Sequence, residues 1–457
     1  MSSHTRGAPA PVTSAAPRPA HRDRAVGGHD RHVRQPQALH ARITRGAPRS
    51  LAAYLAIPRP KDMIKGLLMP FTFALAVLAG ADVGGHTLLR ALVVWAALEL
   101  LIYPARYQWN DVRGFVADQQ HPAKGARGRL PGPIESARPH VLASCTVAVG
   151  RLAVAASLAL AWPALHLGPV LAAVTAGVFS TAVLYETLRA KCTGRSGEVP
   201  SPLRPAVIAL WIVVGAGYAV RGMAGFALAV DLGEDPALGV VAAVALWAFG
   251  IAFVTSRWAL EATAFASADR GQLTWSARPE HAREHLLALV RWLPRRIDVP
   301  APADWTPLRE HTSTAAPWNA ALLVAGTGAA LTGSLLTTPG APTSAAVATA
   351  LGALATAAAV LLPQRRPLIV LAGAAVQWAV PVLRHEPHPL AALLPWLSVM
   401  TAYLVFSSRS LNTIGALSRR LSSACAVLLG SIARGVLGPA TWSAVRKEPG
   451  ESLGEPR

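Results

Sequence analysis

The sequence predicts an all-α, polytopic membrane bundle, and three observations lead to this fold class. The chain has 457 residues, of which 52% are hydrophobic and 15% are charged. Soluble domains carry about 25% charged residues, so the low charge content indicates a membrane environment. Apolar runs long enough to cross a hydrocarbon core of about 30 Å recur from Met63 onward. Basic loops alternate with loops that lack Lys and Arg, as expected for helices that cross a bilayer in succession.

Ten apolar segments are the candidates for these helices. Each is close to the length of about 20 residues that a membrane-spanning helix needs. They are residues 63–81, 88–105, 140–161, 164–186, 205–229, 237–258, 317–337, 343–362, 367–383 and 389–407. We therefore expect a bundle of about nine or ten transmembrane helices.

The connecting loops predict how this bundle is oriented. The loops after the second, fourth, sixth and eighth segments are basic, whereas those after the first, third, fifth and seventh contain neither Lys nor Arg. Positively charged loops remain on the cytoplasmic side of a membrane. The pattern predicts a multi-pass protein of the cell membrane whose two termini and basic face are cytoplasmic.

Composition divides the chain into five parts. Residues 1–48 are rich in Pro, Ala, Arg, His and Ser, which predicts a disordered basic tail. A helical half at 49–266 carries an aspartate-rich motif and is the expected catalytic part. It is followed by an arginine-rich cytoplasmic loop at 267–312, further transmembrane helices and an amphipathic segment at 313–437, and a second disordered tail at 438–457.

The net charge of +19 does not indicate a nucleic-acid-binding protein. Nine arginines fall within the first 50 residues, and most of the remaining excess lies in the basic loops. Membrane topology explains that placement, so the bilayer is the expected partner. The cysteines Cys145, Cys192 and Cys425 are far apart and form no CxxC or CxxH pattern. Neither a disulfide framework nor a zinc site is predicted.

A dense polar block, "NDVRGFVADQQHPAKGAR", begins at the end of the second apolar segment. Asp111 and Asp118 are seven positions apart, so both lie on one face of a helix that continues from this segment. Asn110 is beside Asp111, and Gly114 lies between the two acids on the same face. Two carboxylates and a carboxamide suit a hard divalent cation such as Mg²⁺, which binds through carboxylates and substrate phosphates. The block therefore predicts a site for a metal–diphosphate complex.

Basic residues follow the acids at once. His121, Lys124 and Arg127 are placed to contact the remaining phosphate oxygens of a bound diphosphate. The chain has few lysines, yet Lys65 and Lys191 also fall on the expected cytoplasmic face, where they can reach the same site. The alternative interpretation is a cytoplasmic loop whose cations only follow the topology rule. That interpretation explains the cations but not the spacing of the aspartates.

These residues resemble a known family. The block is similar to the first aspartate-rich motif, N-D-x-x-D-x-x-x-D, of the UbiA-type prenyltransferase superfamily. Its continuation, D-x-x-H-P-x-K-x-x-R, is closest to the decaprenyl-phosphate phosphoribosyltransferases of bacterial cell-wall biosynthesis. The strings "RPKDMIKGLL" from Arg59, "GYAVRGMAG" from Gly217 and "SRWALE" from Ser256 are similar to three further motifs of that branch. The resemblance covers residues 55–265, and the last four segments match only as hydrophobic helices.

The resemblance implies a fold, a reaction and a site. The family is an all-α bundle whose members bind a diphosphate through Mg²⁺. This branch transfers a 5-phosphoribosyl group from phosphoribosyl diphosphate to a polyprenyl phosphate lipid and releases diphosphate. The implied metal ligands are Asn110, Asp111 and Asp118, the two aspartates being catalytic. The implied phosphate-binding residues are Lys65, His121, Lys124, Arg127, Tyr185, Lys191, Arg221 and Arg257.

Two departures from the family pattern leave alternatives open. Gly114 stands where the motif has its middle acid, and no acid lies near Leu210, where the branch has another. Prenyl transfer to a quinone-type or other small acceptor, a catalytically degenerate homologue and a transporter-like scaffold are the alternatives. Arg221 lies within an apolar segment, where ionisable groups usually serve a function. Glu99, in the second segment, is expected either to line the cavity or to pair with a polar neighbour.

Overall fold

The computed structural model describes Tyr54 and residues 65–119, 130, 134–279, 282–306 and 312–410, together with scattered positions between 413 and 442. Predictions for the two tails, for most of the amphipathic C-terminal segment and for His121, Lys124 and Arg127 fall outside these residues. In the described part, nearly all regular structure is helical.

Nine described helices are long and apolar enough to cross a membrane, which confirms an all-α, multi-pass membrane bundle. The first predicted segment, 63–81, forms a shorter apolar helix, Lys65–Leu78. The helices of the first half are α3 (Leu68–Leu78), α4 (Gly85–Ala97), α5 (Tyr103–Arg113), α6 (Phe115–Gln119), α7 (Ala137–Ala161), α8 (Leu167–Lys191), α9 (Pro205–Val213), α10 (Ala216–Ala229) and α11 (Pro236–Ala262). Those of the second half are α13 (Pro317–Thr337), α14 (Pro342–Leu361), α15 (Arg366–Leu383) and α16 (Pro389–Ser408).

Proline marks where many of these helices begin. Pro205, Pro236, Pro317, Pro342 and Pro389 are the first residues of α9, α11, α13, α14 and α16. A proline is well placed there because the first helical N–H has no partner within the helix and the ring already holds a helical φ angle. The start of each of these helices is therefore indicated by a single local residue.

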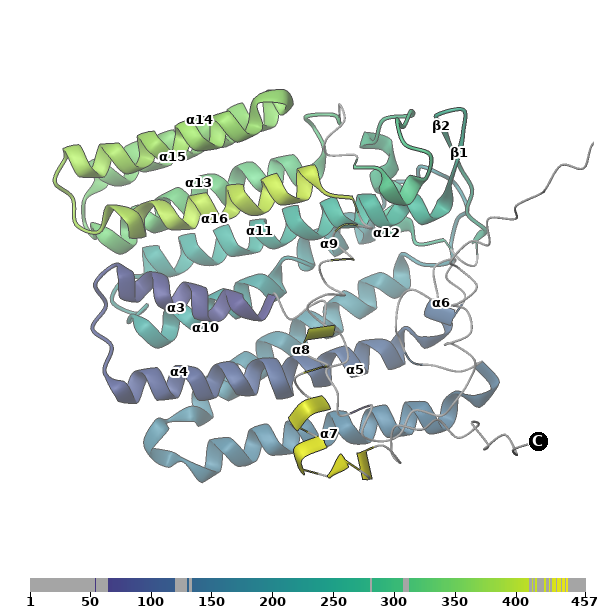
Figure 1. Cartoon of the computed structure of the whole chain (residues 1–457), viewed down its shortest axis with the longest axis horizontal. Helices are drawn as coiled ribbons and strands as arrows, with labels where there is room; N and C mark the ends of the chain where they lie inside the picture. The colour runs from purple at the N-terminus through teal and green to yellow at the C-terminus, as the bar shows by residue number, and fades with distance from the viewer. Residues whose placement is uncertain are drawn as a thin grey trace, which may run out of the picture. The chain divides into compact units, whose positions relative to one another are not determined.

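Small residues let the helices of the second half pack closely. In Figure 1, α11, α13 and α16 run side by side, with α14 and α15 beyond them. A Cβ atom at Gly333 of α13 would lie 2.0 Å from the carbonyl oxygen of Ala392 in α16. Only glycine permits this approach, and such small-residue contacts replace the hydrophobic effect that is absent between helices in lipid.

The expected arginine-rich loop after α11 is a folded segment, which we call the cap (residues 263–279 and 282–306). It contains the antiparallel strands β1 (Ala266–Asp269) and β2 (Gln272–Trp275) and the short helix α12 (Glu284–Leu287). Its run "LLALV" is apolar, and Leu286, Leu287 and Leu289 are fully buried. Burial of this run against α9 and α11 explains why the segment folds, although its arginines suggested a solvated loop.

The cap lies at one end of the bundle, with β1, β2, α12 and α6 together at the right of Figure 1. This end, which we call the motif end, is where α5 and α8 finish and where α9 and α13 begin. The indole Nε1 of Trp211 in α9 donates to the carbonyl oxygen of His285 in α12 at 2.9 Å. This contact fixes the cap against α9.

Candidate functional site

The polar block lies on two helices rather than one. The helix α5 ends at Arg113, Gly114 forms a turn, and α6 continues from Phe115. The amide of Asp118 still donates to the carbonyl oxygen of Gly114 at 2.9 Å, so the helical register is nearly kept across the turn. Asp111 and Asp118 are both buried, with 6% and 3% of their surfaces exposed. We call the surface formed by Asn110, Asp111, Gly114 and Asp118 the aspartate face.

Two residues of α8 complete one side of this face. The side-chain amide of Asn110 donates to Oε1 of Glu186, and Nη2 of Arg189 lies 2.5 Å from Oε2 of the same carboxylate. A Cβ atom at Gly114 would lie 2.7 Å from Nη2 of Arg189. The guanidinium therefore lies directly against the position where the family motif has its middle acid.

Arg106 is a cation of this site that sequence reasoning missed. It lies one turn before Asn110 on α5, and its Cζ is 5.2 Å and 5.7 Å from the ring centroids of Tyr107 and Tyr185. In the described part of the chain, Arg106 contacts these rings and no carboxylate. The signal in the sequence was its spacing of four residues from Asn110, which places both on one helix face. Sequence reasoning counted it only as a topology-setting charge.

A buried ion pair lies deeper in the bundle, near the same helices. Nε of Arg221 in α10 donates to Oε1 of Glu99 at 2.8 Å, and its Nη2 donates to the hydroxyl of Tyr107 at 3.4 Å. Glu99 is part of η2 (Leu98–Ile102), a π-helical turn between α4 and α5. Such turns often occur at functional sites. The alternative that Glu99 pairs with a polar neighbour is thus realised, with Arg221 as the partner.

Tyr103 holds the arginine of this pair from one side. Cζ of Arg221 lies 3.2 Å from the centroid of the Tyr103 ring, while the Tyr103 hydroxyl donates to the carbonyl oxygen of Gly217 at 2.9 Å. Lys65, at the start of the first apolar helix, has its Nζ 5.9 Å from the ring centroid of Tyr218. Helix α10 thus contacts Lys65 through Tyr218 and contacts Tyr103 of α5 through Arg221.

The cap contributes directly to the aspartate face. Nη2 of Arg283 lies 2.7 Å from Oδ1 of Asp118 and 3.4 Å from the carbonyl oxygen of Ala117. The next residue, Glu284, is fully buried, and its Oε2 is 3.6 Å from Nη1 of Arg204 at the start of α9. Leu210, the position that lacks the family's acid, is fully buried in the apolar core beside the cap. The contact between Arg283 and Asp118 could not be predicted from the sequence, because the two residues are 165 positions apart.

Two sequence-predicted residues lie apart from these clusters. Nε of Arg257 lies 3.2 Å from Oε1 of Glu261 one turn along α11, and both side chains are partly exposed. Lys191, the last residue of α8, is exposed. Tyr185 does join the site through its ring contacts with Arg106 and Arg189. The structure therefore brings Lys65, Asn110, Asp111, Asp118, Tyr185 and Arg221 to neighbouring parts of the bundle, and it leaves the other two at its margin.

Magnesium fits the described part of the aspartate face poorly. Asp118 and Glu186 each face a guanidinium, and Arg189 takes the space beside Gly114. Like charges about 4 Å apart repel by about 4 kcal/mol near a protein surface, so a cation would compete with these arginines. Among the described residues, no group of three or more His, Cys, Asp or Glu is placed to hold a metal. The magnesium site stays a prediction from the sequence pattern and from the resemblance.

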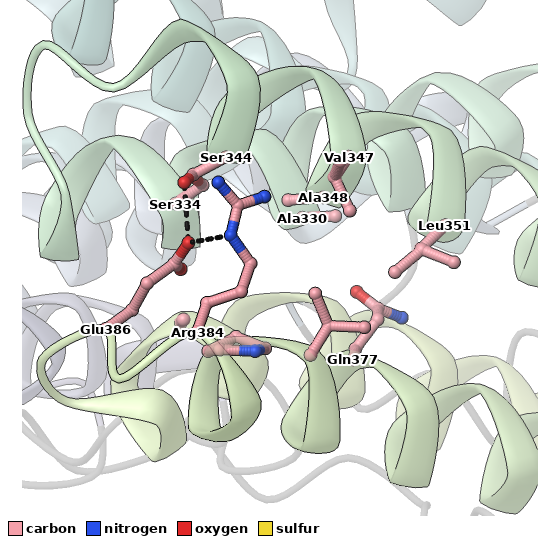
Figure 2. Close-up of a pocket in the computed structure, with 12 residues that line it drawn as sticks. Ala330, Ser334, Ser344, Val347, Ala348, Leu351, Gln377, Arg384 and Glu386 are labelled. Carbon is pink, nitrogen blue, oxygen red and sulfur yellow. Dashed lines mark hydrogen bonds and ion pairs between the residues drawn. The ribbon is translucent and has the colours of Figure 1, made fainter.

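A separate pocket lies among α13 to α16, far from the polar block along the chain. Figure 2 shows Glu386 between Arg384 and the Ser344 hydroxyl, with Gln377 on the pocket wall. Oε1 of Glu386 lies 3.1 Å from Nε of Arg384 and 2.5 Å from Oγ of Ser344. Glu386, Arg384 and Ser344 thus satisfy one another, whereas the buried Nε2 of Gln377 has no hydrogen-bond partner among the described residues. None of the sequence-predicted site residues lines this pocket.

Comparisons with known protein families, with curated proteins and with solved structures found no match.

Proposed function

We propose that this protein is an intramembrane transferase of the UbiA type that moves a diphosphate-activated group onto a polyprenyl phosphate. The donor is phosphoribosyl diphosphate, and the transferred group is 5-phosphoribosyl. The proposal places the motif end in the cytoplasm, where a soluble donor reaches it, and the acceptor's chain in the bilayer.

The observation that supports this proposal most is the position of Arg106. Its guanidinium Cζ lies 5.2 Å and 5.7 Å from two tyrosine ring centroids, one turn from Asn110, without a carboxylate partner among the described residues. A guanidinium presents N–H donors in a planar fork that matches phosphate oxygens. Arg106 therefore has the charge, the donors and the location to bind the donor's diphosphate beside the aspartate face.

The chemistry follows from this placement. A phosphate oxygen of the lipid forms a bond to C1 of the ribosyl group. The bond from C1 to the diphosphate oxygen breaks, and its electron pair stays on the departing diphosphate. Arg106 stabilises the negative charge that develops on this leaving group. Lys65 is proposed to contact the phosphates from the start of the first apolar helix, and the roles of Arg221, His121, Lys124 and Arg127 remain predictions from the sequence.

A direct assay tests the proposal. Purified protein in lipid nanodiscs is incubated with labelled phosphoribosyl diphosphate and polyprenyl phosphate, and labelled lipid is the expected product. Turnover of a prenyl diphosphate with a quinone-type acceptor, and no labelled phosphoribosyl lipid, would instead establish the alternative reaction.

The aspartates provide a second test of the same proposal. Asp111→Asn and Asp118→Asn are each expected to lower turnover at least tenfold, because both carboxylates belong to the proposed site. The matched control is Asp269→Asn, since Asp269 is exposed in the cap hairpin. Equal turnover in all three variants would rule out the aspartate face as the reaction site.

A catalytically degenerate homologue is the second candidate, and two observations favour it. The middle acid is absent at Gly114, and the second acid position, Leu210, is buried in apolar packing. Such a protein binds the donor or the lipid without turnover and acts as a scaffold. Donor binding together with a complete lack of labelled product would support this candidate over the transferase.

A further inference from the structure

We infer that the aspartate face binds diphosphate directly through Arg189 and Arg283, which provide the positive charge that a divalent metal ion would otherwise supply. The inference rests on the proposed donor-binding function and specifies its chemistry. The ligand class is an inorganic diphosphate or a diphosphate ester, and its binding does not depend on a divalent cation.

Arg189 is fixed where the motif's middle acid is missing. Its Nη2 and Nη1 atoms lie 2.7 Å and 3.3 Å from the Cβ position of residue 114. The ion pair with Glu186 and the contact with the Tyr185 ring, 5.8 Å from its Cζ, hold the guanidinium in place. Any side chain at position 114 would displace it. Glycine at position 114, where the motif has an acid, therefore leaves the space that the Arg189 guanidinium occupies at the aspartate face.

Arg283 is fixed one turn further along the same face. Its ion pair with Asp118 is 2.7 Å long, and its side chain is buried, with 6% exposed. The backbone around it is equally constrained, since the amides of Leu286 and Leu287 donate to the Arg283 carbonyl oxygen at 2.9 Å and 3.0 Å. The amide of Glu284 donates to the Cys192 carbonyl oxygen at 2.9 Å. The backbone of the cap thus fixes the position of the Arg283 guanidinium.

The two arginines lie beside neighbouring positions of one helical surface. The amide of Asp118 donates to Gly114 in the α-helical register, and residues four apart on a helix face have Cβ positions about 5–6 Å apart. The phosphorus atoms of a diphosphate are closer together than this, but the terminal oxygens on its two linked phosphoryl groups can span such a distance. One guanidinium at each position can therefore contact one phosphoryl group.

Each guanidinium retains donors for such a ligand. A guanidinium carries five N–H donors, and the carboxylate contacts described above engage Nη2 of each arginine. The paired carboxylates hold the arginines in place without using all of these donors. Because an arginine is charged at every physiological pH, the two guanidiniums keep their positive charge without recruiting an ion.

Binding of inorganic diphosphate by the full-length protein in neutral-lipid nanodiscs tests the inference. Equilibrium dialysis with labelled diphosphate is performed in EDTA and in excess Mg²⁺. The expected dissociation constants agree within about threefold. Binding that disappears in EDTA and returns with Mg²⁺ would overturn the inference while preserving the proposed donor site. An absence of binding in both conditions would overturn the proposed function as well.

Variants assign the binding to the two arginines. Arg189→Gln and Arg283→Gln are each expected to weaken diphosphate binding in EDTA by about 10- to 100-fold, the range for loss of a hydrogen bond to a charged group. Arg195→Gln is the matched control, because Arg195 is exposed just after α8. Unchanged binding in both arginine variants would overturn the inference.

Gly114→Asp gives a test that does not remove an arginine. The new side chain would displace the Arg189 guanidinium, whose Nη2 lies 2.7 Å from the Cβ position, so diphosphate binding in EDTA is expected to fall at least tenfold. Because this substitution also restores the motif's middle acid, Mg²⁺ is expected to recover the affinity. Binding in Gly114→Asp that remains strong in EDTA would contradict the proposed role of Arg189.

Discussion

Arg221 and Glu99, 122 positions apart in the chain, form an ion pair inside the bundle, with Nε of Arg221 2.8 Å from Oε1 of Glu99. The pair connects α10 to the π-helical turn between α4 and α5. Both side chains are largely inaccessible. An unpaired charge at such a position is costly, so the two residues constrain how these helices pack.

The ion pair predicts a non-additive effect on stability. Glu99→Leu leaves the Arg221 guanidinium buried without its carboxylate, and the expected loss in unfolding free energy is about 3–5 kcal/mol. The double variant Glu99→Leu/Arg221→Met is expected to recover most of this loss, because apolar side chains of similar volume replace both charges. Unfolding of the purified variants in detergent measures both effects. A double variant as unstable as the sum of the single variants would contradict the pairing.

The contact between α13 and α16 predicts an intolerance to a single methyl group. Gly333→Ala places a Cβ atom 2.0 Å from the Ala392 carbonyl oxygen, so the helices must separate. We expect a loss of about 1–3 kcal/mol, as for other overpacked sites. Gly150→Ala in α7 is the control, since nothing lies within 4 Å of its Cβ position. Equal melting temperatures for both variants would show that this approach is not needed for stability.

The position of Arg106 predicts that its replacement lowers the affinity for the donor. Arg106→Gln removes a guanidinium that has ring contacts but no carboxylate partner in the described part of the chain. Loss of a charged hydrogen bond costs about 1.5–3 kcal/mol, so donor binding is expected to weaken about 10- to 100-fold with little change in melting temperature. The control is Arg113→Gln on the same helix, because Arg113 is exposed. Similar affinities in both variants would exclude Arg106 from the donor site.

The buried thiol of Cys192 is expected to make the folded protein less stable at alkaline pH. Burial raises the pKa of its thiol from 9.0 to about 11, and Glu284 adds to this rise while Arg195 and Arg204 oppose it. Above pH 9 the unfolded chain loses this proton and the folded chain keeps it, so stability falls until about pH 11. The fall is about 1.4 kcal/mol for each pKa unit of difference between the two states.

The Cys192→Ala variant isolates this effect from other groups that titrate in the same range. Unfolding free energies of both proteins are measured between pH 8 and about pH 11, the upper limit set by the raised pKa. The wild type is expected to lose more stability than the variant over this window. Parallel curves would show that the thiol does not titrate differently in the two states.

The membrane helices were predictable because their signal is local. Each needs about 20 apolar residues, and the nine long helices together with Lys65–Leu78 correspond to the ten predicted segments. The cap was not predictable in the same way. Its apolar run, Leu286 to Val290, is short and flanked by charges, and only burial against α9 and α11 makes it part of a core.

The aspartate face was also predictable from the sequence only in part. Helical spacing alone placed Asn110, Asp111 and Asp118 together, and the structure keeps all three buried at the motif end. The arginines that face them come from α8 and from the cap. The pair of Arg189 with Glu186 is local, three positions apart on α8, and can be read from helical spacing. The contact of Arg283 with Asp118 joins residues 165 positions apart, and such a distant partner leaves no periodic signal.

The sequence by itself determined the membrane environment, the positions of the apolar helices in the described part of the chain and the acids of the polar block. Hydrophobic length and helical periodicity act between near neighbours in the chain, and both can be read without coordinates. Only the tertiary structure decided which charge faces which acid. Glu99 pairs with Arg221, Asp118 pairs with Arg283, and Arg189 lies against Gly114. Buried charges must find partners wherever the fold brings them close, and that proximity is a property of the packed bundle.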